Sequence, residues 1–302
     1  MSQRDELTAA RDLPDAPAKA DELERIAADA DAAGDVRLGF DARCALMEVH
    51  HRLERWRMVE PFRWCRWVVN HHPEAFGPAD EAALRLHHLR AVLAAYGSPR
   101  IGIEQIVELL DDLDRRLPGR RTVYRLRCQL ADHLGDEPAA RQWLARWQAA
   151  DPETDGDCAG CEPAWQAELL AGWGEWAEAV RVVEPVLAGR LRCPAQPERA
   201  LAAVMVACLH LDRPADAARA HVRAYQRHRA EWDALPLPAD HLRFCALTEH
   251  YERGLRILGD HLGRLDCPYD EAAAMRFAAA GALLCRLAVA AGVTAAPIHR
   301  RA

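Results

Sequence analysis

The chain has 302 residues, half of them hydrophobic, with few aromatic residues and a formal net charge of -7. This length is ample for one large core or for an extended array of small units, and the composition favours helices over sheets. The 39 basic residues against 46 acidic ones argue against a general nucleic-acid-binding protein, which normally has a net basic domain.

The start of the chain predicts a flexible arm followed by a helix. Residues 1–18 are rich in Asp, Ala and Pro and begin with charges instead of the apolar run of a signal peptide. We therefore expect a flexible N-terminal arm and no export signal. The stretch from Asp21 to Ala33 predicts a first helix that ends at Gly34. Without export, the ten cysteines are expected in a reducing cytoplasm, where disulfides are rare.

Arginine and tryptophan alternate in two nearby stretches, Arg55-Trp56-Arg57 and Arg63-Trp64-Cys65-Arg66-Trp67. Such combinations can stack on nucleobases or bind an acidic peptide. The i, i+3 spacing of Trp64 and Trp67 equally suits packing between helices, and packing is the interpretation that we favour.

Motifs of known enzymes are missing from the sequence. Three histidine pairs occur, at 50–51, 71–72 and 87–88, but adjacent residues on a helix point about 100° apart and do not easily bind one ion. The sequence also has no His-Glu-x-x-His, no glycine-rich phosphate loop and no nucleophile elbow. We therefore predict a protein without catalytic activity.

A turn followed five positions later by a small residue recurs along the chain. The turns at 97, 135, 174 and 212 are 38, 39 and 38 residues apart. The small residues that follow them are Gly102, Ala140, Ala179 and Ala217, and weaker copies are Glu54 with Val59 and Glu249 with Gly254. Such regular spacing is typical of a helical solenoid, and we expect about six helical hairpins.

The small residue has a physical reason, because it is expected where the second helix of a hairpin crosses the first. A large side chain at this crossing would force the two helices apart. Prolines mark the exits of the pairs, at Pro73, Pro118, Pro152, Pro194 and Pro268. No single pair can bury its apolar face alone, so neighbouring pairs must stack.

This pattern resembles the tetratricopeptide repeat (TPR) family, most closely from Tyr124 to Pro152, where Leu-Gly-Asp, Ala140 and the closing Asp-Pro fall at family spacing. The resemblance covers residues 37–268, with units slightly longer than the usual 34 residues. It implies an all-α, right-handed α-solenoid over 19–268. The segments 157–161 and 185–193 are also similar to a group of uncharacterised actinobacterial repeat proteins, which have no assigned activity.

The end of the chain, residues 269–302, predicts a capping helix from Tyr269 to Ala291 and a short basic tail. Phe277 to Ile298 is the one stretch that suggests a membrane span, and Arg286 divides it into two pieces shorter than a spanning helix needs. We therefore expect a buried helix and no membrane association.

In the tetratricopeptide family the first helices of the hairpins line a groove that binds a partner segment. By register, the resemblance places twelve residues of this chain on such a face: Glu48, His51, Arg52, His87, His88, Arg125, Gln129, Asp132, Trp165, Glu168, Arg199 and Arg243. The arginines among them are suited to holding carboxylates bidentately.

Two cysteines three residues apart lie in a glycine-rich loop, Asp155 to Trp165. The start of a hairpin's first helix and the end of its second helix lie at the same edge. We therefore expect Cys193, just past the partner helix, beside Cys158 and Cys161. Three thiolates approach the four-ligand tetrahedron of structural zinc. The fourth ligand is expected to be His228, with His221 second and Asp157 or water after them.

Two other interpretations of the cysteine loop stay open. Cys-x-x-Cys at a helix N-terminus can be a redox pair because the helix dipole lowers a thiol pKa, although no strand precedes it as in thioredoxin. The thiols can also be ordinary loop residues. We assign six further cysteines to core packing: Cys44, Cys65, Cys128, Cys208, Cys245 and Cys285.

These observations predict a cytoplasmic, noncatalytic adaptor that binds a protein or peptide segment, with a possible structural zinc ion at its centre. The first alternative is a regulatory protein that senses a peptide or small ligand. The second is a metal-dependent enzyme that uses an open coordination position at the cysteine site. The sequence carries no prediction of the oligomeric state.

Overall fold

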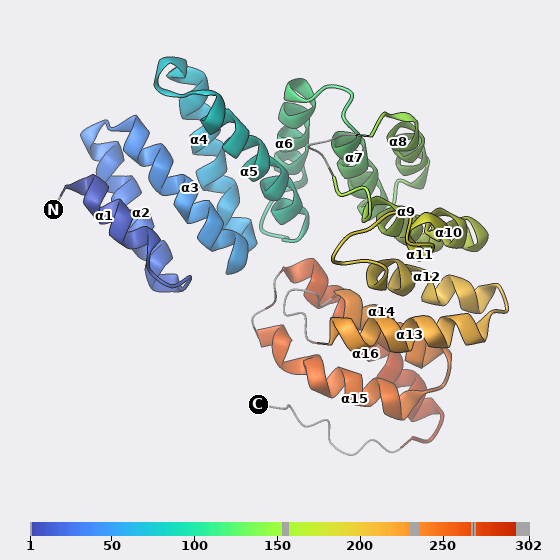
Figure 1. Ribbon diagram of the computed structural model, residues 1–302. Helices are drawn as coiled ribbons and strands as arrows, with labels where there is room; N and C mark the ends of the chain where they lie inside the picture. Colours follow the sequence, from blue (N-terminus) through green and yellow to red (C-terminus); the bar gives the residue numbers. More distant parts are fainter. Residues whose placement is uncertain (1, 153–156, 230–235, 267, 269, 294–302) are drawn as a thin grey trace. The chain divides into compact units, whose positions relative to one another are not determined.

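The computed structural model describes residues 2–152, 157–229, 236–266, 268 and 270–293 (Figure 1). These residues form sixteen α-helices, α1 to α16, and three short 3-10 helices, η1 to η3, with no strand among them. The prediction of an all-α protein is confirmed. The chain divides into two compact units, which are Met1–Arg116 with Tyr269–Ala272 (unit 1) and Leu117–Pro268 with Ala273–Ala302 (unit 2).

Unit 1 is a succession of helices in which each packs against the next in the chain. Its elements are α1 (Gln3–Arg11), α2 (Pro17–Ala33), α3 (Val36–Arg52), η1 (Arg55–Met58), α4 (Val59–His71), η2 (Pro73–Ala75), α5 (Pro78–Tyr96) and α6 (Ile103–Arg116). The predicted helix that ends at Gly34 corresponds to α2, which starts four residues earlier because Pro17 occupies its first turn.

Helix α1 lies within the residues that we expected to be a flexible arm. Ser2 and Asp5 form a capping box, in which each side chain accepts a hydrogen bond from the backbone N–H of the other residue. Leu7 and Ala10 are buried in the core formed with α2 and α3. A cap and two apolar residues on one helix face are therefore enough to order this segment against α2.

Unit 2 is built mainly from helical hairpins. Its elements are α7 (Arg121–His133), α8 (Glu137–Ala149), α9 (Glu162–Gly172), α10 (Trp176–Val182), α11 (Glu184–Leu187), α12 (Glu198–His210), α13 (Pro214–His228), α14 (Pro236–Leu247), α15 (Tyr251–His261), η3 (Leu262–Asp266) and most of α16 (Glu271–Ala290). The pairs α7–α8, α9–α10, α12–α13 and α14–α15 are each joined by a three-residue turn and pack against each other.

The four turns of these pairs share one backbone conformation. The left-handed residues are Gly135 (φ 75°), Gly174 (φ 79°), Asp212 (φ 55°) and Glu249 (φ 60°). In each turn the next residue donates its N–H to a carbonyl five residues earlier, as from Asp136 to Ala131 at 2.9 Å. This bond closes the C-terminus of the first helix, so one local geometry recurs at the expected spacing.

The predicted small residues lie at the helix crossings in the four pairs of unit 2. Ala140, Ala179 and Ala217 have no exposed surface. At Gly254 a Cβ atom would lie 2.6 Å from Leu284 Cδ1, closer than van der Waals contact permits. Gly102 differs, because it is exposed in the loop before α6, where the turn at 97 is longer than in the other hairpins.

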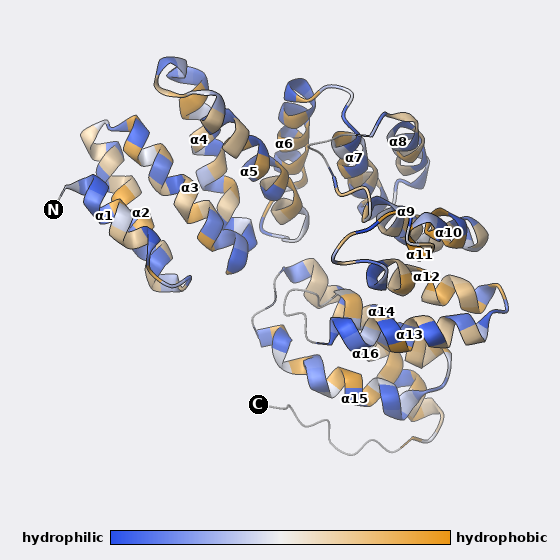
Figure 2. Ribbon diagram, viewed as in Figure 1, coloured by the Kyte–Doolittle hydropathy of each residue, from blue (hydrophilic) through white to orange (hydrophobic). Residues whose placement is uncertain are grey.

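Helix α16 is the one described helix that is long and apolar enough to cross a membrane, by length and composition alone. Along the chain, most helices carry both hydrophilic and hydrophobic residues (Figure 2). The buried residues of α16 are Ala273, Phe277, Gly281, Leu284 and Ala288, and Ala273, Phe277 and Leu284 belong to the core of unit 2. This spacing of three or four residues is that of a helix with one face on the core, and only 28% of its most apolar window is buried. The predicted tail lies largely outside the described residues.

Candidate functional site

The predicted groove residues of unit 1 are mostly occupied by contacts within the unit. Glu48 binds Arg90 at 2.6 Å and lies 3.7 Å from His87, which is buried. His88 is completely buried, with its Nε2 atom 2.8 Å from the carbonyl oxygen of Leu109. Arg52 is largely exposed and pairs with Asp15, and His51 is half-buried. Neither His87 nor His88 is open to a partner, because both face the inside of the packed helices.

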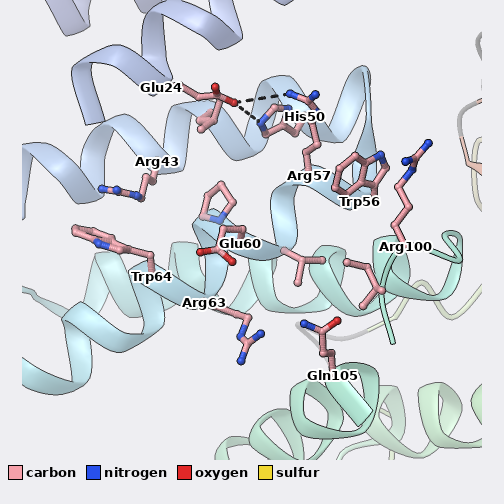
Figure 3. A pocket seen from close by; sticks show the side chains of 14 residues that line it. Glu24, Arg43, His50, Trp56, Arg57, Glu60, Arg63, Trp64, Arg100 and Gln105 are labelled. Atoms are coloured by element: carbon pink, nitrogen blue, oxygen red, sulfur yellow. Dashed lines mark ion pairs between the residues drawn. The ribbon is translucent and has the colours of Figure 1, made fainter. Parts of the chain in front are cut away.

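A cleft of about 490 Å³ lies in unit 1 between α2, α3, η1, α4, the loop after α5, and α6 (Figure 3). Its walls carry Trp56 and Trp64 from the arginine-tryptophan stretches, together with Arg57 and Arg63. Burial of His50 in the wall, and secondarily the charge of Arg57, lower the histidine pKa to about 4, so this imidazole is neutral at pH 7.

Packing accounts for part of the tryptophan pattern, as the sequence suggests. Trp64, on α4, packs against α3, where a Cβ atom at Gly39 would be 3.0 Å from its ring. Trp67 is half exposed and stacks on His71 at a ring-centroid distance of 4.3 Å. The cleft itself was missed, because its walls come from four helices and only the Arg-Trp stretches signal it in the sequence.

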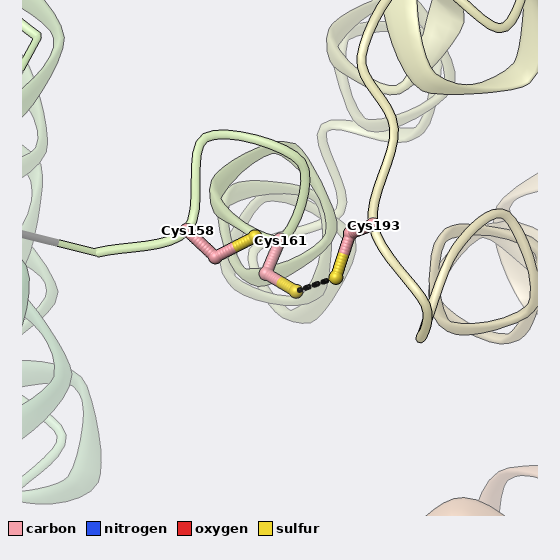
Figure 4. A group of neighbouring side chains, drawn as sticks. All are labelled: Cys158, Cys161 and Cys193. Atoms are coloured by element: carbon pink, nitrogen blue, oxygen red, sulfur yellow. Dashed lines mark hydrogen bonds between the residues drawn. The ribbon is translucent and has the colours of Figure 1, made fainter. Parts of the chain in front are cut away.

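In unit 2, three cysteines come together at one edge of a hairpin (Figure 4). Cys158 lies in the loop before α9, Cys161 is the N-cap residue of α9, and Cys193 lies in the loop before α12. Their sulfur atoms are all within 4.8 Å of one another, and Sγ of Cys161 is 3.5 Å from Sγ of Cys193. The prediction that Cys193 lies beside the Cys-x-x-Cys pair is confirmed.

Backbone geometry brings the two cysteine loops together. The carbonyl oxygen of Cys158 accepts hydrogen bonds from the N–H groups of Cys161 and Glu162, at 2.8 and 3.1 Å, which forms a tight turn into α9. At Gly160 a Cβ atom would lie 2.9 Å from Cβ of Cys193 and 3.1 Å from the carbonyl oxygen of Arg192. Only glycine permits this approach of the second loop.

Two arginines of α7 bind carboxylates that precede and follow the cysteine pair. Arg125 binds both carboxylate oxygens of Asp157, at 2.6 and 2.9 Å, and both side chains are more than nine-tenths buried. Arg121 binds the carboxylate of Glu162 through two nitrogens, at 3.3 and 2.5 Å. The Arg125 guanidinium also lies 4.6 Å from the ring centroid of Trp165. Bidentate pairs fix orientation as well as distance, so the loop is anchored on both sides of its cysteines.

The thiols differ in acidity. Burial and the neighbouring Cys193 raise the pKa of Cys161 to about 12. Burial also acts to raise the pKa of Cys193, but the N–H of Ala195 and the two other thiols outweigh it and lower that pKa. Cys193 therefore loses its proton more readily than Cys161. For comparison, zinc–sulfur bonds of about 2.3 Å in a tetrahedron place sulfurs about 3.8 Å apart, which the spacing of this cluster approaches.

The structure does not place the expected fourth ligands with the cysteines. Among the described residues, the cluster contains no further histidine, cysteine or carboxylate. His228 is buried with its ring 5.8 Å from that of His241, and Nδ1 of His221 is 3.1 Å from Nδ1 of His241. Asp157 binds Arg125 instead. The prediction of His228 is corrected, because the end of α13 packs into the core against α14, away from the cysteine loops.

These histidines form a buried cluster between α13, α14 and α15. It contains His221, His228, His241 and His261, with the hydroxyl of Tyr225 at 3.2 Å from Nε2 of His261. Burial, and secondarily Arg253, lower the pKa of His221 to about 4, and burial lowers that of His261 to about 4. Burial and the neighbouring histidines lower the pKa of His241 to about 2. At neutral pH these three histidines are uncharged.

The predicted groove residues of unit 2 divide into buried and exposed groups. Gln129 accepts a hydrogen bond from Arg125 at 2.8 Å, and Asp132 accepts one from the indole N–H of Trp173 at 2.7 Å. The exposed members are Asp132, Glu168 and Arg243, while Arg199 is half-buried. Solvent reaches Glu168, but the surrounding protein removes enough hydration to raise its pKa to about 7, against the opposing charge of Arg276.

Comparison with known proteins does not assign the chain to a family. No model of a protein family matches the chain, and no curated protein matches it.

Proposed function

We propose that the chain is a cytoplasmic, noncatalytic adaptor whose hairpins belong to a right-handed, tetratricopeptide-like array and bind a protein or peptide segment. The observation that carries this proposal is the repeated hairpin, with one turn geometry at residues 135, 174, 212 and 249. Stacked hairpins bury apolar faces against each other and leave a long surface for a partner.

The surface that we assign to the partner in unit 2 is the charged face of its first helices, with Glu168 on α9, Arg199 on α12 and Arg243 on α14. These side chains reach solvent to different degrees and carry both signs of charge. A face of this kind selects a partner by complementary charge more than by apolar area.

Selection from a displayed library of random peptides tests the adaptor function. We expect enrichment of peptides with a shared motif, which bind the purified chain with saturation in fluorescence anisotropy. Replacing Arg199 and Arg243 by glutamate should weaken binding of peptides that use unit 2 at least tenfold. Arg181→Glu, an exposed change on the second helix α10, is the matched control. Failure to enrich any peptide over an unrelated helical protein would contradict the adaptor function.

We further propose that Cys158, Cys161 and Cys193 bind a structural zinc ion. The convergence of three sulfurs within 4.8 Å supports it, as does the anchoring of the loop by Arg121 and Arg125. Thiolate ligands suit zinc. Zinc would join the beginning of α9 to the loop that precedes α12, and so fix one hairpin to the next.

Metal analysis of protein purified without chelator tests the zinc site. We expect about one zinc ion per chain in the wild type, and loss of most of it in each of Cys158→Ser, Cys161→Ser and Cys193→Ser. Cys285→Ser, at a half-buried cysteine of α16, should keep its zinc. Absence of metal from the wild type, or equal retention in all variants, would refute the site.

The fourth ligand separates a structural site from a catalytic one. The absorption spectrum of the cobalt(II)-substituted protein reports the number of thiolates and the coordination geometry. A nitrogen or sulfur donor from the protein in the fourth position supports a closed, structural site. An exchangeable water in that position would favour the alternative of a metal-dependent enzyme.

A further inference from the structure

The cleft of unit 1 carries side chains arranged for binding negative charge. Guanidinium groups cover its two indole rings, since Arg43 lies 3.7 Å from the ring centroid of Trp64 and Arg100 lies 5.1 Å from that of Trp56. Arg57 contacts the ring of Trp56 as well, at 5.6 Å. Stacking fixes the plane of a guanidinium and directs its N–H edge toward an acceptor. At Arg43 this acceptor is Asp31, at 2.5 Å, whereas Arg57 and Arg100 are more exposed.

Arginines outnumber carboxylates among the residues that line the cleft, and each arginine also has a carboxylate partner: Asp31 for Arg43, Glu54 for Arg57, Glu108 for Arg63 and Glu271 for Arg100. Four arginines line it, at 43, 57, 63 and 100, against the two carboxylates Glu24 and Glu60, and His50 is neutral at pH 7 because burial lowers its pKa. In Figure 3, Arg57 and Arg100 flank Trp56 at one end of the cleft, and Arg63 lies between this end and Trp64. Guanidinium groups are therefore distributed along the cleft.

The arginines at the mouth are held by contacts that a ligand can replace. Arg100 binds Glu271 at 3.2 Å and Arg63 lies 3.6 Å from Glu108, and roughly half or more of each arginine side chain is exposed. Arg57 is paired with Glu54 at 2.7 Å, lies 4.0 Å from Glu24 and is slightly less than half exposed. Exposed ion pairs contribute only about 0–1 kcal/mol, so exchange for a ligand carboxylate costs little.

We propose that this cleft binds a carboxylate-rich, extended segment of the partner protein, which would make it a specificity subsite of the adaptor. The inference rests on the proposed function and gives the partner its chemistry. Alternate side chains of an extended segment are about 7 Å apart on one side, so one segment can reach several of the arginines. The apolar residues Leu46, Val59 and Ile101 in the wall suit an apolar side chain between the acidic ones.

The same geometry disfavours a nucleotide in the cleft. A nucleobase needs an open aromatic face on which to stack, but arginine lies over both indole rings. Bidentate binding of carboxylates needs only the guanidinium edges, and these remain accessible at Arg57 and Arg100.

The test uses the full chain and a fluorescein-labelled twelve-residue peptide in which glutamates flank leucines. Fluorescence anisotropy should give saturable binding that weakens with added salt, while the same peptide with glutamine for glutamate should bind at least tenfold more weakly. Arg57→Gln combined with Arg100→Gln should weaken binding of the acidic peptide at least tenfold. Arg85→Gln, at an exposed arginine of α5 outside the cleft, should change it less than twofold.

Three results would overturn the inference. Equal loss in the Arg57/Arg100 and Arg85 variants would mean attraction by net charge without a site. Displacement of the acidic peptide by ADP at lower concentration than by unlabelled peptide would assign the cleft to nucleotides. Absence of acidic-peptide binding, while library-selected peptides still bind the chain, would refute this subsite and leave the adaptor function standing. Circular dichroism confirms that each variant keeps its helices.

Discussion

Acidification from pH 7 to pH 5 is expected to destabilise the protein by several kcal/mol, in large part through the buried histidine cluster. The pKa of His221 and of His261 is about 4 and that of His241 is about 2 in the folded chain, against about 6.5 for an unfolded histidine. Above pH 6.5 both states are neutral at these residues. Between pH 6.5 and 4 the unfolded chain binds protons that the folded chain does not, so stability falls as pH falls.

Urea unfolding at a series of pH values measures how steeply the free energy of unfolding falls with pH. Each of the three histidines contributes about 1.4 kcal/mol per pH unit in this window, so together they remove about 6 kcal/mol by pH 5. Many proteins have only about 5–15 kcal/mol in total. His50, His51 and His88 in unit 1 also have pKa values near 4 and add to the same fall.

Single histidine variants measure how much of the pH dependence of stability comes from the histidine cluster. His261→Gln should reduce the slope of unfolding free energy against pH by about 1.4 kcal/mol per pH unit, whatever it does to stability at pH 8. His133→Gln, at an exposed position of α7, is the matched control. A wild-type slope in the His261 variant, or a wild-type protein that keeps its full stability down to pH 4, would show that these histidines do not govern the acid response.

Replacing Arg125 by methionine is expected to destabilise unit 2 by about 3–5 kcal/mol, because it leaves the buried carboxylate of Asp157 without its partner. Both side chains are more than nine-tenths buried, and Arg125 also loses its contacts with Gln129 and Trp165. Urea unfolding at pH 7.5 in the presence of EDTA measures this loss without any contribution from metal. The same variant should bind zinc more weakly, since the cysteine loop loses its anchor.

A double-mutant cycle checks this explanation. Arg125→Met with Asp157→Leu should be more stable than Arg125→Met alone, because no buried charge is left unpaired. Arg181→Met, which breaks an exposed pair with Glu178, should cost less than about 1 kcal/mol. If the Arg125 variant unfolds like the Arg181 variant, the buried pair does not hold the loop.

Local signals in the sequence were sufficient for most helices and most turns. The turns at 135, 174 and 212 fall between helices as expected, and the small residues five positions later are buried at the crossings. The position of Cys193 beside Cys158 and Cys161 also followed from the sequence, because it requires only that a hairpin returns to its starting edge.

Other features depend on contacts between distant residues, which no local pattern contains. The anchoring pairs join α7 to residues 32 and 41 positions later. The choice of His228 as a zinc ligand failed for the same reason, since the path of the chain after α13 determines whether it reaches the cysteines or the core. The cleft in unit 1 likewise depends on which arginines reach the same space. The arm at 1–18 was misjudged because its composition hid a capping box.

The shared turn geometry has a consequence for how such a chain can change during evolution. The bond that closes each turn is made by the main chain, and the left-handed position holds glycine in two turns but Asp212 and Glu249 in the others. For residues other than glycine this conformation costs about 1 kcal/mol, so selection against them is weak. Turn sequences can therefore drift apart while the hairpins keep their form, and a duplicated hairpin can lose its likeness to its parent long before it loses its shape.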